Sequence, residues 1–121
     1  MGVNKKILVI DDDLDIRTLY SELLTDNGYD TDVAVSGEEG LYKARNASYD
    51  LILLDIMMSN ENGLDVLLTL KKDNPTRKVM ICTNLSGPEV SEEAKKNGAD
   101  EFFVKSNTDP GKLLEKVTSL L

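Results

Sequence analysis

The sequence predicts an α/β fold in which helices cover both faces of one parallel sheet. Three observations lead to this prediction. Short apolar runs alternate five times with longer segments whose apolar residues recur at helical spacing. The run at residues 51–54 is apolar throughout, which is typical of a strand buried on both faces. The chain has 121 residues, 40% hydrophobic and 30% charged, which suits one globular domain with one core.

Five short segments are expected to be strands. The segment Leu-Ile-Leu-Leu at residues 51–54 gives the clearest signal, and the second strand gives the weakest. The expected strands are residues 6–10, 31–35, 51–54, 79–82 and 101–104.

A helix is expected after each strand. Ser36 can cap the second helix, from Gly37 to about Ala47, with Glu39 at the spacing of a capping box. The first helix ends at residues 27–28 (Asn-Gly), the third near residues 74–75 (Asn-Pro), the polar fourth covers residues 88–97, and the fifth covers residues 110–120. The apolar positions that define the other helices are Ile16, Leu19, Tyr20, Leu23 and Leu24 in the first, Leu64, Leu67 and Leu68 in the third, and Leu113, Leu114, Val117 and Leu120 in the fifth.

Five strand–helix pairs in this order predict a three-layered, doubly wound parallel sheet with right-handed crossovers. With five strands, we expect the flavodoxin-like order 2-1-3-4-5, and one domain over residues 1–121. In such a sheet the site lies outside the carboxyl ends of the strands, beside the switch point between strands 1 and 3.

The composition restricts the function classes. With 14 basic and 22 acidic residues the net charge is −8, which argues against direct binding to nucleic acid or to a membrane surface. There is no histidine, so acid–base chemistry at neutral pH falls to carboxylates, lysine or water. No apolar run approaches the length of a membrane span, and residues 1–6 lack the apolar core of a signal peptide, so a cytoplasmic protein is expected.

Polar residues follow four of the expected strands at the points where these strands end. They are Asp11, Asp12 and Asp13 after the first strand, Asp55 after the third, Thr83 after the fourth and Lys105 after the fifth. The carboxyl ends of parallel strands share one edge of the sheet, and the first and third strands are neighbours. Asp11, Asp12 and Asp55 are therefore expected to converge, whereas Asp13 is expected to cap the first helix.

Three converging carboxylates favour a bound cation. Each like-charge pair at about 4 Å costs on the order of 4 kcal/mol at an effective dielectric constant near 20. Mg²⁺, or Mn²⁺ in its place, relieves this repulsion, prefers oxygen ligands and keeps waters that a phosphate can replace. With Lys105 as a positive charge and Thr83 as a hydroxyl donor, the site suits a phosphoryl group. Asp55 is then the expected nucleophile, and it would form an aspartyl phosphate.

At this point the sequence resembles the receiver domain of a two-component response regulator, of the chemotaxis-receiver type, over the whole chain. The residues that carry the resemblance are 7–12 (Ile-Leu-Val-Ile-Asp-Asp) with Arg17 after them, 53–58 (Leu-Leu-Asp-Ile-Met-Met) with Gly63 after them, Thr83 and Lys105. As a set, these motifs are highly specific.

The resemblance implies a role for each matching residue of the site. Asp55 matches the phosphoacceptor, Asp12 the direct Mg²⁺ ligand, and Asp11 a ligand that acts mainly through water. The backbone carbonyl of Met57 matches a further metal ligand, and Lys105 matches the lysine that pairs with the phosphate. Such a domain promotes its own phosphorylation and dephosphorylation and is not a turnover enzyme.

The resemblance also implies a switch and its partners. Thr83 matches the hydroxyl that follows the phosphate, and Phe102 matches the aromatic residue that rotates with it. The phosphoryl donor would be the phosphohistidine of a sensor histidine kinase or a histidine phosphotransfer protein. Phosphorylation would change one face of the domain, formed by residues 88–97, 101–104 and 110–120. This face would contact a second copy of the domain or a downstream effector.

Three positions depart from the family pattern. Ser59 and Ser106 stand where proline is usual, and Asn84 stands where a small residue follows the switch hydroxyl. A cis peptide before Ser106 is not expected, because non-proline cis bonds cost about 2.5–4 kcal/mol, so the loop after Lys105 should take another path. These departures leave the chemical groups in place and bear on the lifetime of the phosphoryl group and on the output.

Three alternative functions fit part of the sequence. Acids from Asp11 to Glu22 match several EF-hand positions, but Ile16 occupies the position that must be glycine. A haloacid-dehalogenase-like phosphatase would use Asp11 as nucleophile, but it needs an acid pair beyond Lys105 that this chain lacks. The third alternative is a degenerate receiver that binds proteins without accepting phosphate.

Overall fold

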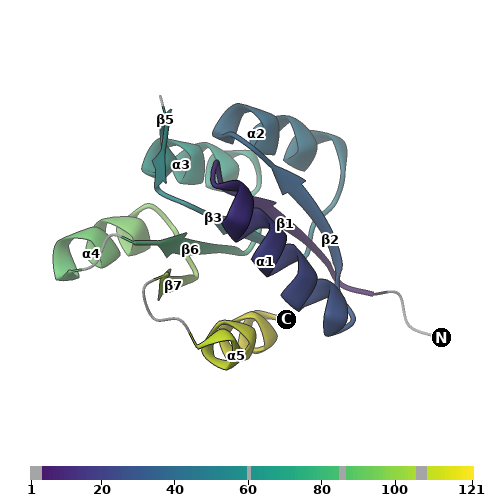
Figure 1. Cartoon of the computed structure of the whole chain (residues 1–121). Coiled ribbons are helices and arrows are strands. Elements are labelled where there is room, and N and C mark those ends of the chain that lie inside the picture. Colours follow the sequence, from purple (N-terminus) through teal and green to yellow (C-terminus); the bar gives the residue numbers. More distant parts are fainter. Residues whose placement is uncertain (1–3, 60, 85–86, 106–108) are drawn as a thin grey trace.

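The computed structural model describes residues 4–59, 61–84, 87–105 and 109–121, and it has the predicted five-stranded parallel sheet. Along the sheet the order is β2-β1-β3-β6-β7, which is the predicted order 2-1-3-4-5 (Figure 1). All neighbouring strands in it run parallel. The strands are β1 (Lys6–Ile10), β2 (Asp30–Ala34), β3 (Leu51–Leu54), β6 (Val79–Thr83) and β7 (Glu101–Val104).

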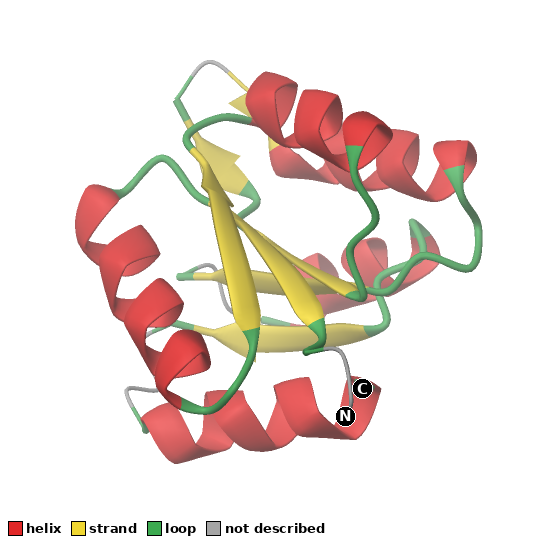
Figure 2. Cartoon of the chain, turned by 90° about the vertical axis from the view of Figure 1, so that its right-hand side faces the viewer, coloured by secondary structure: helices red, strands yellow, loops and turns green. Residues whose placement is uncertain are grey.

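Helices cover both faces of this sheet, so the three-layer prediction is confirmed (Figure 2). One core cluster joins α1 and α5 to the sheet, and the other joins α2, α3 and α4 to the opposite face. The helices are α1 (Leu14–Asp26), α2 (Gly37–Asn46), α3 (Gly63–Asp73), α4 (Pro88–Lys96) and α5 (Pro110–Leu120).

The central strands are apolar throughout because their side chains enter both cores. Ile7 and Val9 of β1 pack on the α1 and α5 side, whereas Leu8 and Ile10 pack on the other side. All four side chains are at most 1% exposed. This packing holds β1 rigidly, and the site begins at the next residue.

Two predicted helix caps are confirmed. The side chain of Asp13 accepts hydrogen bonds from the backbone N–H groups of Asp15 and Ile16, at 2.9 Å and 3.3 Å. Ser36 Oγ accepts the backbone N–H of Glu39 at 3.1 Å. Each cap satisfies an N–H group that the first turn of its helix leaves without an intrahelical partner.

Three details differ from the prediction or lie beyond it. In α3, Leu67 is buried as predicted, but Leu68 is 46% exposed, and Val66 and Leu70 complete the buried stripe; in α1, Leu19 is likewise 54% exposed. A hairpin of two very short strands, β4 (Met57–Met58) and β5 (Glu61–Asn62), lies between β3 and α3. Two-residue strands are too short for a periodic pattern, so the sequence did not predict them. The path predicted at Ser106 lies outside the described residues.

No helix in the described part of the chain has both the length and the apolar character needed to cross a bilayer.

Candidate functional site

The sheet fixes the backbone of the site residues. The backbone N–H of Asp55 donates to the carbonyl of Ile10 at 3.1 Å, which extends the pairing of β1 and β3 by one residue. In the same way, the N–H of Lys105 donates to the carbonyl of Thr83 at 2.8 Å. The side chains of Asp55 and Lys105 therefore start from hydrogen-bonded backbone positions next to buried strands.

Asp11, Asp12 and Asp55 converge, as predicted. One carboxylate oxygen from each lies within 4.8 Å of the other two. Asp11 is 2% exposed and Asp55 is 5% exposed, whereas Asp12 is exposed to solvent. Three oxygen donors at such separations, with one side open to water, form an acidic triad typical of a Mg²⁺ site.

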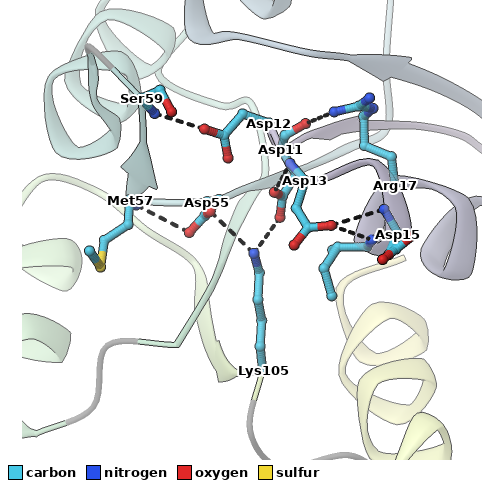
Figure 3. Close-up of polar contacts among 10 residues, drawn as sticks. Asp11, Asp12, Asp13, Asp15, Arg17, Asp55, Met57, Ser59 and Lys105 are labelled. Carbon is cyan, nitrogen blue, oxygen red and sulfur yellow. Dashed lines mark hydrogen bonds and ion pairs between the residues drawn. The ribbon is translucent and has the colours of Figure 1, made fainter.

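Lys105 is the buried counter-charge of this triad. Its Nζ forms ion pairs with Asp11 and with Asp55, the latter at 3.1 Å from Asp55 Oδ2 (Figure 3). The side chains of all three residues are at most 6% exposed. Ion pairs removed from solvent to this extent are screened little by water or salt.

The pKa values in this cluster shift in the directions that burial and charge dictate. Burial raises the pKa of the Asp55 carboxyl, the charge of Lys105 opposes that increase, and the charge of Asp11 reinforces it. Burial alone would lower the pKa of Lys105, but its hydrogen bonds and ion pairs with Asp11 and Asp55 raise that pKa above its ordinary value. One lysine facing two buried carboxylates therefore leaves a negative charge that a cation can balance.

Asp11 is held by two contacts besides Lys105. The backbone N–H of Asp13 donates to Asp11 Oδ1 at 2.9 Å, and Arg17 Nη1 donates to the Asp11 carbonyl at 2.7 Å. Arg17 belongs to the motif at residues 7–17, and the sequence alone assigned it no role. The structure shows that Arg17, one turn into α1, fixes the backbone on which two of the three carboxylates stand.

The segment after Asp55 turns back sharply toward α3. The Met57 backbone N–H donates to Asp55 Oδ1 at 3.1 Å, and the Gly63 N–H donates to the Ile56 carbonyl at 2.8 Å. A Cβ atom on Gly63 would lie 2.3 Å from the Asp55 carbonyl oxygen. Because the obstacle is backbone, glycine is required at this position to keep α3 close to the site.

The two predicted switch residues lie at the carboxyl end of β6 and within β7. Thr83 is 0% exposed at the carboxyl end of β6, on the same edge as Lys105. Phe102 is half-buried and packs against the core on the side of α2, α3 and α4. Asn84, directly after Thr83, is exposed.

Ser59 stands where the family usually has proline, and it makes a contact that proline could not make. Its backbone N–H donates to Asp12 Oδ2 at 2.7 Å and lowers the pKa of the Asp12 carboxyl (Figure 3). Proline has no N–H group, so this hydrogen bond depends on the departure from the family pattern.

The variant Ser59→Pro should therefore raise the pKa of Asp12 in the metal-free protein. A lowered folded-state pKa adds stability above the unfolded-state pKa, and this stability is lost as the pH falls through the folded-state pKa. Ser59→Pro should lack that contribution. Ser59→Ala keeps the N–H group, which contributes most, and loses only the smaller contribution of the Ser59 side chain, so its Asp12 pKa should stay closer to that of the parent protein. A carbon-13 NMR titration of the Asp12 carboxyl measures the difference, and equal pKa values in the two variants would contradict the assignment.

Comparisons with known proteins agree with this geometry. The family model described as response regulator receiver domain matches residues 7–118. The chemotaxis protein CheY of Thermotoga maritima is 28% identical over 119 residues, which cover 98% of each chain. The transcriptional regulatory protein ZraR of Escherichia coli is 37% identical over 102 residues, or 84% of this chain, but this chain spans only 23% of its length.

Solved structures are similar over nearly the whole chain. The response regulator TrrA of Thermotoga maritima, in complex with Mg²⁺ and a beryllium fluoride, has a TM-score of 0.88 at 40% identity, covering 97% of this chain and 99% of the other. CheY of Borrelia burgdorferi, in a complex with CheX, BeF₃ and Mg²⁺, has a TM-score of 0.94 at 26% identity, covering 98% of this chain and 90% of the other.

Proposed function

This chain belongs to the response regulator receiver domain family, and we propose that Asp55 is the phosphoacceptor of its signalling switch. The observation that carries the proposal is the setting of Asp55. Its carboxylate is 5% exposed, lies among oxygens of Asp11 and Asp12 within 4.8 Å of one another, and is 3.1 Å from Lys105 Nζ. Phosphoryl transfer asks mainly for such positioning and for neutralisation of charge.

We propose that Asp11, Asp12, Asp55 and the Met57 carbonyl hold Mg²⁺ or Mn²⁺. When bound, the cation supplies positive charge against the oxygens of the transferring phosphoryl group. Lys105 supplies a second positive charge beside Asp55, and Thr83 contributes its hydroxyl at the same edge of the sheet. The exposed carboxylate of Asp12 keeps that side of the site accessible to the donor.

The proposed donor is a phosphohistidine of a sensor histidine kinase or a histidine phosphotransfer protein. A carboxylate oxygen of Asp55 attacks the phosphorus atom and forms the new P–O bond. The P–N bond breaks, and the imidazole nitrogen keeps its electron pair. The domain would later promote its own hydrolysis, in which water attacks phosphorus and the P–O bond to Asp55 breaks. It would therefore act as a switch and not as a turnover enzyme.

The proposed output is a change of the face formed by α4, β7 and α5. The phosphoryl group would draw Thr83 inward, and Phe102 would repack. A second copy of this domain or a downstream effector would read the altered face, with no direct contact to nucleic acid or membrane because the net charge is −8. We further propose that residues 1–121 form a single receiver domain that works in the cytoplasm, where ATP-dependent kinases act.

A phosphodonor assay tests this function. The protein is incubated with acetyl phosphate and Mg²⁺, and its intact mass is measured. We expect a gain of one phosphoryl group that requires Mg²⁺. If there is neither an adduct nor binding of BeF₃⁻, the domain is the degenerate receiver, which binds proteins without being phosphorylated.

The variant Asn84→Ala should shorten the lifetime of the phosphorylated domain. Asn84 is exposed directly after Thr83 and can donate a hydrogen bond at the mouth of the site. One hydrogen bond of about 1 kcal/mol corresponds to roughly a fivefold change in the rate of hydrolysis. The decay of the phosphoryl adduct over time, followed by intact mass, gives the rate of hydrolysis. The variant Asn46→Ala, remote from the site, is the control. Equal half-lives for Asn84→Ala and the parent protein would contradict the prediction.

A further inference from the structure

One carboxylate ties the hairpin after Asp55 to the start of α2. In this hairpin, Glu61 of β5 lies opposite Met58 of β4. Glu61 Oε1 accepts the backbone N–H of Gly37 at 2.8 Å, and Glu61 Oε2 accepts the N–H of Glu38 at 2.9 Å. These N–H groups belong to the first turn of α2, where the helix offers them no partner and its dipole favours a negative charge.

The residues at the start of α2 leave room for the carboxylate of Glu61. A Cβ atom on Gly37 would lie 2.7 Å from Glu61 Oε2 and 2.5 Å from Val66 Cγ2, so a larger residue would displace the carboxylate. Helix α2 already has an N-cap of its own, because Ser36 Oγ accepts the N–H of Glu39 at 3.1 Å. Glu61 accepts the two N–H groups that this cap does not reach, and in doing so it ties the hairpin to α2.

The hairpin carries groups of the candidate metal site. Met57 bears the carbonyl proposed as a ligand, and its N–H donates to Asp55. The N–H of Ser59 donates to Asp12 at 2.7 Å. The side chains of Met57 and Ser59 are exposed, so the core does not hold them, whereas Met58 is 7% exposed and packs inward. Met58, by packing into the core, and Glu61, by its hydrogen bonds to α2, therefore attach the hairpin to parts of the fold outside the acidic triad.

We propose that Glu61 is a positioning residue for the metal site. It holds the hairpin against α2, so that the Met57 carbonyl and the Ser59 N–H keep their places beside Asp55 and Asp12. This inference rests on the proposed function, because it assumes that the acidic triad binds Mg²⁺. Outer residues that orient metal ligands commonly change metal affinity by one to two orders of magnitude when they are removed.

The test is a titration with Mg²⁺ alone, without a phosphodonor. The NMR signals of the backbone amides of Met57 and Ser59 are monitored during the titration. We expect Glu61→Ala to weaken Mg²⁺ binding about tenfold. Glu61→Gln keeps the shape and one acceptor oxygen, so its loss should be smaller but measurable. This near-isosteric variant keeps the test meaningful if Glu61→Ala does not fold.

The matched control is Ser36→Ala, which removes the cap of the same helix without touching the hairpin. We expect it to lower the melting temperature while leaving Mg²⁺ affinity as in the parent protein. If both Glu61 variants bind Mg²⁺ like the parent while the amide signals of Gly37 and Glu38 shift, Glu61 only caps α2 and the inference is wrong. If the parent protein itself binds no Mg²⁺, the metal site of the proposed function fails, and the inference fails with it.

Discussion

Asp55→Asn should give no phosphoryl adduct under conditions in which the parent protein gains the mass of one phosphoryl group. The amide lacks the anionic oxygen that attacks phosphorus, so the expected effect is complete loss. The fold should survive, because the asparagine oxygen can still accept the Met57 N–H that Asp55 Oδ1 accepts at 3.1 Å. Removing one of the converging charges should also relieve repulsion. Intact mass after incubation with acetyl phosphate and Mg²⁺ measures the effect.

Two further variants make this result specific. Asp13→Asn removes an exposed carboxylate next to the triad but keeps an oxygen that can cap α1, so it should form the adduct like the parent. Asp11→Asn weakens the metal site and should slow the reaction without abolishing it. An adduct that persists in Asp55→Asn but disappears in Asp11→Asn would contradict our proposal and would favour the phosphatase-like use of Asp11.

The strands could be predicted because their apolar runs are strong local signals, and the triad followed from the sheet order usual for five strand–helix pairs. Residues 51–54 are apolar throughout, and in the structure each of them is at most 1% exposed. Once β1 and β3 are neighbours, the residues after them must meet, and the Asp55 N–H indeed bonds to the Ile10 carbonyl. Identification of Asp11, Asp12 and Asp55 as one cluster therefore needed only the strand ends and the topology.

The hydrogen bonds that support the triad could not be predicted in the same way. The bond from Ser59 to Asp12 uses a backbone N–H, which every residue except proline has, so only the absence of proline gave a signal. The bonds of Glu61 join residues 23 and 24 positions apart in sequence, with no periodic pattern between them. Leu68 was placed on the buried stripe of α3 because its spacing from Leu64 fits, yet Val66 and Leu70 take that place in the structure.

Lys105→Met should destabilise the metal-free fold by on the order of 3–5 kcal/mol, the usual cost of removing one partner from a buried ion pair. The Lys105 side chain is 6% exposed and faces the carboxylates of Asp11 and Asp55, which are 3% and 6% exposed. Methionine fills a similar volume without the charge, so the loss would come mainly from the two unpaired carboxylates. Urea unfolding at mildly alkaline pH, without divalent cations, measures it.

The destabilisation should shrink on acidification and on addition of Mg²⁺. Without Lys105, the pKa of Asp55 should rise further, because burial and the charge of Asp11 remain while the opposing charge is gone. A folded-state pKa above the unfolded-state value destabilises the fold above that folded-state pKa, and the penalty is relieved as the pH falls through it. A cation bound by the triad should offset the same repulsion, since it stabilises only the folded state.

The control is Lys72→Met, an exposed lysine in the last turn of α3. A substitution there should change the free energy of unfolding by no more than about 0.5 kcal/mol, with no dependence on Mg²⁺. Equal losses for the two variants would mean that Asp11 and Asp55 do not remain charged and buried together in the metal-free protein. A loss confined to Lys105→Met and reversed by Mg²⁺ would show that the lysine and the cation balance the same carboxylates.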